Sequence, residues 1–221
     1  MDSVQAILDK SIKSREYIIE ESKKGRTVSL KEINFDALAD IFDKQHKNME
    51  FEWLKNLVSY KLKEMIKLNT SRLDYQKKFE TLIETYNSGS ANVNYSYKEL
   101  INFAKELKKE DERAITENLT EEELSLFDKL KKPDLTEKEK IQVKKVAKGL
   151  LGALKAEKLV IDWRKKQQAI AAVKKEIEDE RDQGLPDSYI PEIYKEKCNL
   201  VFQHIYDSYA GDNHSIFEAI A

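Results

Sequence analysis

Hydrophobic residues recur at steps of three and four along most of the chain, the spacing that places them on one face of an α-helix. The clearest run covers 51–86 and predicts one long helix or two helices in series. Two helices are expected before it, one over 3–24 and one beginning at Ser29. The alternation typical of β-strands is confined to fragments such as 93–97, so no sheet is predicted.

Four capping boxes mark where helices are expected to begin. In each, a Ser or Thr hydroxyl can accept from the third helical N–H while a Glu three residues later reaches back. The four pairs are Ser29 with Glu32, Ser96 with Glu99, Thr120 with Glu123, and Thr136 with Glu139. Three of them also have a hydrophobic staple, a pair of apolar residues that flanks the cap: Val28 with Ile33, Tyr95 with Leu100, and Leu119 with Leu124.

Proline and aspartate set the expected boundaries in the last third of the chain. Pro133 separates the helices from Thr120 and Thr136, and Asp162 is interpreted as the N-cap of a helix over 163–182. Pro191 suits the first position of a final helix that ends near 209. The residues of this helix that we expect to face inward are Ile193, Tyr194, Leu200, Val201 and Ile205.

Small, turn-forming residues at 87–92 interrupt the helical pattern. They suggest an N-terminal helical segment over 1–87, a linker or loop over 88–94, a C-terminal helical region over 95–210 and a tail over 211–221. Whether the two helical segments are separate units is left open. The predicted fold class is an all-α, multi-helix bundle of roughly seven to nine helices with no significant sheet.

Composition supports a helical protein with hydrated surfaces, since 36% of the residues are charged and there are only six Gly and three Pro. The lone Cys198 excludes a disulfide framework and fits a reducing, cytoplasmic location. No apolar run approaches the ~20 residues that span a bilayer, so no membrane association is expected. The net charge is −2, but 144–175 has ten basic residues and two acidic ones. This stretch indicates either a binding face or, more commonly, a solvated helix face.

The motifs of common catalytic sites are missing from the sequence. There is no phosphate-binding glycine loop and no HExxH, and His46, His204 and His214 are not at metal-ligand spacing. His204 is interpreted as a hydrogen-bonded structural histidine and Cys198 as a small buried apolar residue. Asp134 follows Pro133 as in some nuclease motifs, but it lies between two capped helices and is interpreted as a loop residue. No catalytic, cofactor-binding or metal-binding residue is predicted.

Two segments resemble a known family. LTEEELSLFD at 119–128 is similar to a TxEELxxFD segment, and LVIDWRKKQQ at 159–168 to an LVLDWRKKQQ segment, both near the end of type I restriction R subunits. The likeness continues in order through 171–173, 177–179, 184–186, 194, 197–198 and 201–209. The first 118 residues are generic helical sequence. The chain therefore resembles the C-terminal helical domain of the R subunit (HsdR) of type I restriction-modification enzymes.

The resemblance implies a longer parent protein, in which a nuclease domain and two RecA-like motor domains precede the helical region. Such a subunit joins a methyltransferase core of M and S subunits, translocates DNA with ATP and cuts it. We therefore expect this chain to be a non-catalytic, monomeric part of that subunit that docks it to the core. ATP and Mg²⁺ are expected for the parent subunit only. The alternatives are a helical module that contacts DNA and a free-standing helical interaction adaptor.

The candidate contacts with a partner or with DNA lie in the second segment. They are Arg164, Lys165, Lys166, Gln167 and Gln168, which combine charge with directional hydrogen-bond donors. This mixture suits either an interface hot spot or phosphate contacts. Trp163 is interpreted as a core residue, clamped by Ala169, Ile170 and Val173 on the next turn. For Arg164, Gln167 and Gln168, a contact role and a merely solvated position both remain open.

Overall fold

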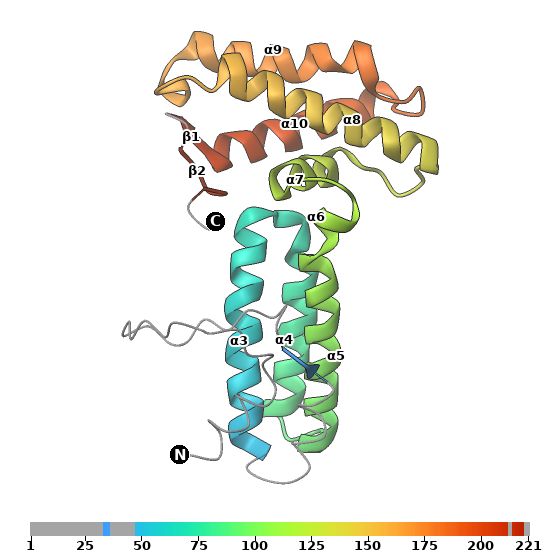
Figure 1. Ribbon diagram of the computed structural model, residues 1–221, viewed down its shortest axis with the longest axis vertical. Helices are drawn as coiled ribbons and strands as arrows, with labels where there is room; N and C mark the ends of the chain where they lie inside the picture. Colours follow the sequence, from blue (N-terminus) through green and yellow to red (C-terminus); the bar gives the residue numbers. More distant parts are fainter. Residues whose placement is uncertain (1–32, 36–46, 212–213, 219–221) are drawn as a thin grey trace. The chain divides into compact units, whose positions relative to one another are not determined.

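The computed structural model describes residues 33–35, 47–211 and 214–218 (Figure 1). The helix expected over 3–24, the Ser29 capping box and His46 lie outside the described residues. Eight α-helices, α3 to α10, lie within them, and the described strands form one short two-stranded ribbon. The prediction of an all-α fold without a significant sheet is therefore confirmed.

The chain divides into two compact units. The first comprises Met1–Met65 with Arg72–Glu112, and the second comprises Ile66–Ser71 with Arg113–Ala221. The predicted linker over 88–94 lies inside the first unit, where it forms the turn between two helices that pack against each other. The positions at which the chain passes between the units are occupied by ordinary helical and turn sequence, without a run of small residues.

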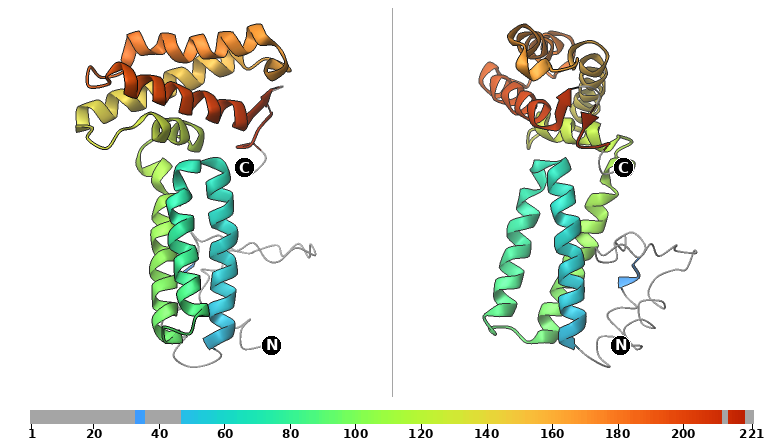
Figure 2. Two further views of the ribbon diagram at one scale, coloured as in Figure 1. Left: turned by 180° about the vertical axis from the view of Figure 1, so that it is seen from behind. Right: turned by 90° about the vertical axis from the view of Figure 1, so that its left-hand side faces the viewer.

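The first unit is built on three helices that lie side by side (Figures 1 and 2). They are α3 (Lys47–Leu68), which continues through a 3-10 turn (Thr70–Arg72) into α4 (Leu73–Asn87), and α5 (Val93–Asp111). The apolar run over 51–86 is thus two helices in series. The described buried hydrophobic side chains of this unit are Ile33, Phe35, Phe51, Leu54, Val58, Leu62, Met65, Phe79, Tyr97, Leu100, Ile101, Phe103, Ala104 and Leu107.

The start of α5 differs from the prediction. The helix begins at Val93 with Asn92 as its N-cap, whose side chain accepts from the Asn94 N–H at 2.9 Å. Ser96, predicted as a cap, is buried inside the helix, and Tyr95 is exposed instead of forming a staple. Asparagine is itself a preferred N-cap, and Tyr97 extends the apolar stripe upstream by one turn, so the helix starts earlier. The strand-like fragment 93–97 is therefore helical, and the capping box predicted at Ser96 was wrong.

The second unit contains α6 (Arg113–Thr116), α7 (Glu121–Leu130), α8 (Glu137–Ala153), α9 (Gln167–Gly184) and α10 (Pro191–Ser208). A π-type turn (Leu154–Lys158) ends α8, and a 3-10 turn (Trp163–Lys165) precedes α9. The chain then forms a ribbon of β1 (Tyr209–Gly211) and antiparallel β2 (His214–Ser215). Both α7 and α9 pack against α8 and α10, which closes a four-helix core (Figure 1).

Local sequence signals set several boundaries of the second unit. The capping boxes at Thr120 and Thr136 both form, and Pro191 is the first residue of α10. These predictions are confirmed. Leu200, expected inward, is exposed because Tyr194, Val201 and Ile205 define the buried face of α10 and Leu200 lies beside it.

The helix predicted from Trp163 begins later. Asp162 adopts a left-handed conformation with φ of 55° and makes no side-chain capping bond. The turn Trp163–Lys165 is 3-10, and α9 starts only at Gln167. Aspartate tolerates the left-handed region better than most residues, which lets the chain turn sharply while Trp163 enters the core. The prediction that Asp162 caps the helix with its side chain was wrong.

Part of the predicted tail is packed. Ile216 N–H donates to Ser208 O at 3.0 Å, and the buried Phe217 ring lies 6.1 Å from that of Tyr209. Ile216 and Phe217 therefore contribute to the second unit's core.

Candidate interaction site

The segment 159–168 crosses from the end of α8 to the start of α9 in the second unit. Trp163 fixes it, because this side chain is fully buried and its Nε1–H donates to the backbone oxygen of Tyr209 at 3.1 Å. The indole also meets the Tyr206 ring edge-on, with centroids 5.8 Å apart. The interpretation of Trp163 as a core residue is confirmed.

Arg164 is held by the same carbonyl. Its Nε–H donates to Tyr209 O at 2.8 Å, and its guanidinium lies over the Tyr206 ring at 5.2 Å from the centroid. The side chain thus joins this segment to the C-terminal end of α10. A contact between Arg164 and a partner stays a prediction, but its described bonds are internal to the unit.

The other four candidate contacts lie together on the exposed side of the loop. Lys165 Nζ pairs with Asp162 Oδ1 at 2.8 Å, and Lys166 Nζ donates to the Ile161 carbonyl at 3.3 Å. The hydrogen bond to Asp162 raises the pKa of Lys165, and the same bond lowers the pKa of Asp162. Gln167 and Gln168 are exposed in the first turn of α9. The structure therefore places these four side chains together on an exposed surface.

Two apolar residues were missed as site residues by the sequence reasoning. Val160 and Ile161 stand between buried Leu159 and buried Trp163, yet 47% and 60% of their surfaces are exposed. A signal was present, since the three consecutive apolar residues at 159–161 and the nearby Trp163 cannot all face one core. We call Val160, Ile161, Lys165, Lys166, Gln167 and Gln168 the loop-tip surface.

The basic stretch over 144–175 is largely paired in space. Lys144 binds Glu117, Lys148 binds Glu123, Lys155 binds Glu122 and Lys158 binds Glu176. Most of these acids come from α7 or the segment before it, far away in sequence. The apparent excess of positive charge is therefore reduced, which favours a solvated, ion-paired face for much of this stretch over a continuous basic track.

The buried histidine has a structural environment. His204 Nε2 lies 2.8 Å from Ser125 Oγ, and its Nδ1 lies 3.3 Å from Ser208 Oγ. Burial, with a smaller contribution from the charge of Lys129, lowers the pKa of His204 to about 4. The ring is therefore neutral at pH 7 and links α7 to α10. Because Ser125 is fully buried, this Ser–His pair is not accessible to a substrate.

Acidic side chains do not assemble into a metal site in the described residues, where no group of three His, Cys, Asp or Glu side chains is placed to hold a metal ion. The buried carboxylate of Asp128 binds Arg113, Lys131 and Asn69. Burial alone would raise the pKa of Asp128, but its bonds to Arg113 and Lys131 outweigh this effect and lower it. Asp134 is exposed in the turn between α7 and α8, as predicted.

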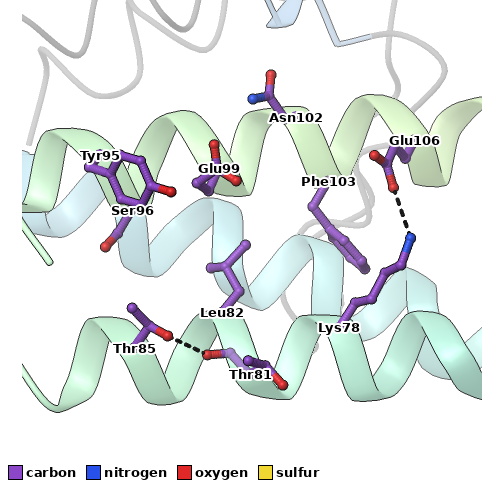
Figure 3. Close-up of a pocket in the computed structure, with 10 residues that line it drawn as sticks. All are labelled: Lys78, Thr81, Leu82, Thr85, Tyr95, Ser96, Glu99, Asn102, Phe103 and Glu106. Atoms are coloured by element: carbon purple, nitrogen blue, oxygen red, sulfur yellow. Dashed lines mark hydrogen bonds and ion pairs between the residues drawn. The ribbon is translucent and has the colours of Figure 1, made fainter. Parts of the chain in front are cut away.

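An open groove of about 310 Å³ lies between α4 and α5 in the first unit (Figure 3). Thr81 and Leu82 of α4 face Glu99 and Phe103 of α5 across it, and Lys78 Nζ pairs with Glu106 at 3.6 Å. Thr85 contributes a hydroxyl that already donates to Thr81 O at 2.8 Å. The lining is mixed in character and shows no convergent set of catalytic groups.

None of the described helices combines the length and the apolar character that a membrane span requires. Solved structures provide no further guide to this chain, because none of them matches it.

Comparison with known proteins gives the chain its family. It is 25% identical to the putative type I restriction enzyme MjaIXP endonuclease subunit of Methanocaldococcus jannaschii over 169 aligned residues. These residues make up 75% of this chain and 16% of that relative. The chain thus spans a small part of the relative's length. Residues 1–209 match the family described as type I restriction enzyme HindI endonuclease subunit-like, C-terminal. Because this match covers nearly the whole chain, the protein belongs to the family of C-terminal domains of type I restriction enzyme endonuclease subunits.

Proposed function

We propose that this domain docks the DNA-translocating and DNA-cleaving R subunit onto the methyltransferase core of M and S subunits and has no catalytic site of its own. The observation that supports this most is the family match over 1–209, in a chain that spans 16% of its relative's length. The proposal assigns ATP and Mg²⁺, and the chemistry that uses them, to the remainder of the longer subunit.

The way the second unit uses its polar groups supports a docking role. Tyr194 donates to Glu178 O at 3.0 Å and Tyr189 donates to Leu130 O at 2.9 Å, so both hydroxyls fasten one element to another. His204 and Ser125 do the same between α10 and α7. A bundle fastened in this way presents its surface in one arrangement, and a preorganised surface loses less entropy when it binds.

Direct binding tests the proposal. The 221-residue chain would be titrated onto immobilised M–S complex from the same restriction system, with an M–S complex of an unrelated system as the control. We expect saturable, selective binding with a Kd of about 1 μM or tighter, corresponding to about −8 kcal/mol. Absence of binding to the cognate complex at about 100 μM chain would remove the proposal.

A second candidate function is contact with DNA, which the basic excess over 144–175 favours. Binding to duplex DNA would then fall steeply with salt, because each neutralised phosphate releases counterions. The ion pairs of Lys144, Lys148, Lys155 and Lys158 reduce the charge available for this role. A titration with fluorescent duplex DNA at low salt separates the two functions, and we expect weak binding without saturation.

A further inference from the structure

We infer that the loop-tip surface is the centre of the docking contact. In this arrangement Val160 and Ile161 enter an apolar depression on a protein partner, and carboxylates around that depression meet Lys165 and Lys166. Arg164 acts behind this surface as a positioning residue. The inference rests on the proposed docking function and adds to it the residues and the chemistry of the partner's surface.

The apolar part of the contact is a pair of adjacent exposed side chains. Leu159 and Trp163 are buried on either side, so the chain is anchored at both ends of the pair while Val160 and Ile161 face solvent. Both are β-branched, and their stiff χ1 angles leave little rotamer freedom to lose on binding. Removing their exposed apolar surface from water on binding is favourable.

The loop is held in one conformation before any partner arrives. Leu159 N–H donates to Leu154 O at 3.0 Å, and Trp163 N–H donates to Val160 O at 3.0 Å. The side chains of Trp163 and Arg164 both donate to Tyr209 O, which ties the loop to the end of α10. Such a backbone resembles a binding loop whose ordering cost is already met in the free protein.

The charges around the loop-tip surface indicate which chemical groups the partner's surface presents. Residues 159–168 include three basic side chains and one acidic one, Asp162, which is paired with Lys165, while Arg164 is bound behind the loop. Lys166 is exposed, and its described bond is to the neutral carbonyl of Ile161. A partner surface with carboxylates is therefore complementary. A protein fits better than DNA, because phosphates offer nothing to the two aliphatic side chains that lie beside these lysines.

The test compares matched exposed residues of the full chain in binding to cognate M–S complex. Ile161→Asp is paired with Ile141→Asp, since Ile141 is a 66% exposed isoleucine on α8 of the same unit. Lys166→Glu is paired with Lys138→Glu, another exposed lysine of α8. We expect Ile161→Asp to raise the Kd at least about tenfold, as for a hot-spot residue. Lys166→Glu should raise it severalfold and weaken its dependence on salt, while both α8 variants stay within about twofold of the unaltered chain.

The outcomes separate this inference from the proposed function. If the unaltered chain binds and Ile161→Asp binds as tightly as Ile141→Asp, the loop-tip surface is not the contact and the docking proposal stands. If the unaltered chain fails to bind, both are overturned. Binding to duplex DNA that Lys166→Glu abolishes and Ile161→Asp leaves intact would contradict a protein partner at this surface. Far-UV circular dichroism and melting temperatures of the four variants check that each is folded.

Discussion

The two units of this protein use polar side chains differently. In the second unit, side chains of Trp163, Arg164, Tyr189 and Tyr194 donate to backbone carbonyls of other elements, at sites fixed by the geometry of a ring or a guanidinium. Ion pairs join helices in both units, for example Arg72 with Glu110 in the first and Lys155 with Glu122 in the second. The second unit adds to them the described bonds from indole and phenol groups to backbone carbonyls.

This difference explains why the resemblance to the family is recognisable in the sequence of the second unit and not in that of the first. A bond from an indole or a phenol to one carbonyl needs that residue type at that position, so the sequence from 119 to 209 is distinctive. A stripe of aliphatic residues without such bonds accepts many sequences. The first unit therefore reads as generic helical sequence although the family match includes it.

The largest expected effect comes from the two tryptophans, one in each unit. Trp163→Ala removes a fully buried ring and its hydrogen bond, and should lower the free energy of unfolding by about 3–5 kcal/mol. Trp53→Ala removes a partly exposed ring of α3 and should cost less than about half of that. Urea denaturation followed by far-UV circular dichroism measures both. Equal losses would break the distinction between the units.

The buried ion pair of the first unit gives the next effect. Glu110→Leu leaves the buried Arg72 guanidinium without this carboxylate and should destabilise by about 3 kcal/mol. Replacing both partners, as Arg72→Met with Glu110→Leu, should restore most of the loss, because no buried charge is then left without its counter-charge. Chemical denaturation of the single and double variants decides. A double variant as unstable as Glu110→Leu alone would contradict this account.

The third prediction concerns how the stability of the second unit depends on pH through His204. Because burial lowers the pKa of His204 to about 4, the folded state binds fewer protons than the unfolded state between about pH 4 and pH 6.5. The contribution of His204 is present above this window and is lost as the pH falls through it. From pH 7 to pH 5 the unaltered chain should lose about 2 kcal/mol more than His204→Gln. Parallel pH profiles of the two proteins would show that His204 does not titrate as described.

The smallest effect concerns helix caps. Thr120→Ala removes the hydroxyl that accepts from Glu123 N–H in a formed capping box and should cost about 1 kcal/mol. Ser96→Ala removes a hydroxyl that is buried inside α5 without a hydrogen-bond partner, and should change stability by less than about 0.5 kcal/mol. Thermal unfolding of the two variants distinguishes them. A loss of stability for Ser96→Ala as large as that for Thr120→Ala would contradict the position of Ser96 inside the helix and indicate that it acts as a cap.

The sequence predicts those features that local chemistry decides. Thr120, Thr136 and Pro191 start helices because their neighbours supply everything that the cap or the first turn needs. Ser96 and Asp162 fail because the apolar stripe of α5 and the burial of Trp163 override local preference. Tertiary packing commonly overrides such signals in this way.

The candidate site was predicted in outline only. Lys165, Lys166, Gln167 and Gln168 are exposed together as their clustering suggested. The structural bonds of Arg164 could not be predicted, because they depend on a carbonyl 45 residues further along the chain. The run 159–161 indicated that some of its apolar residues must face solvent, but which of them do so depends on the loop that Trp163 and Arg164 fix.

Competition tests the docking proposal most directly. An excess of the 221-residue chain would be added to cognate M–S complex together with the full-length endonuclease subunit, and the amount of assembled complex would be measured by native mass spectrometry. The account predicts that the chain displaces the full-length subunit, with loss of DNA cleavage and no loss of methylation. Undiminished assembly at saturating chain would contradict it.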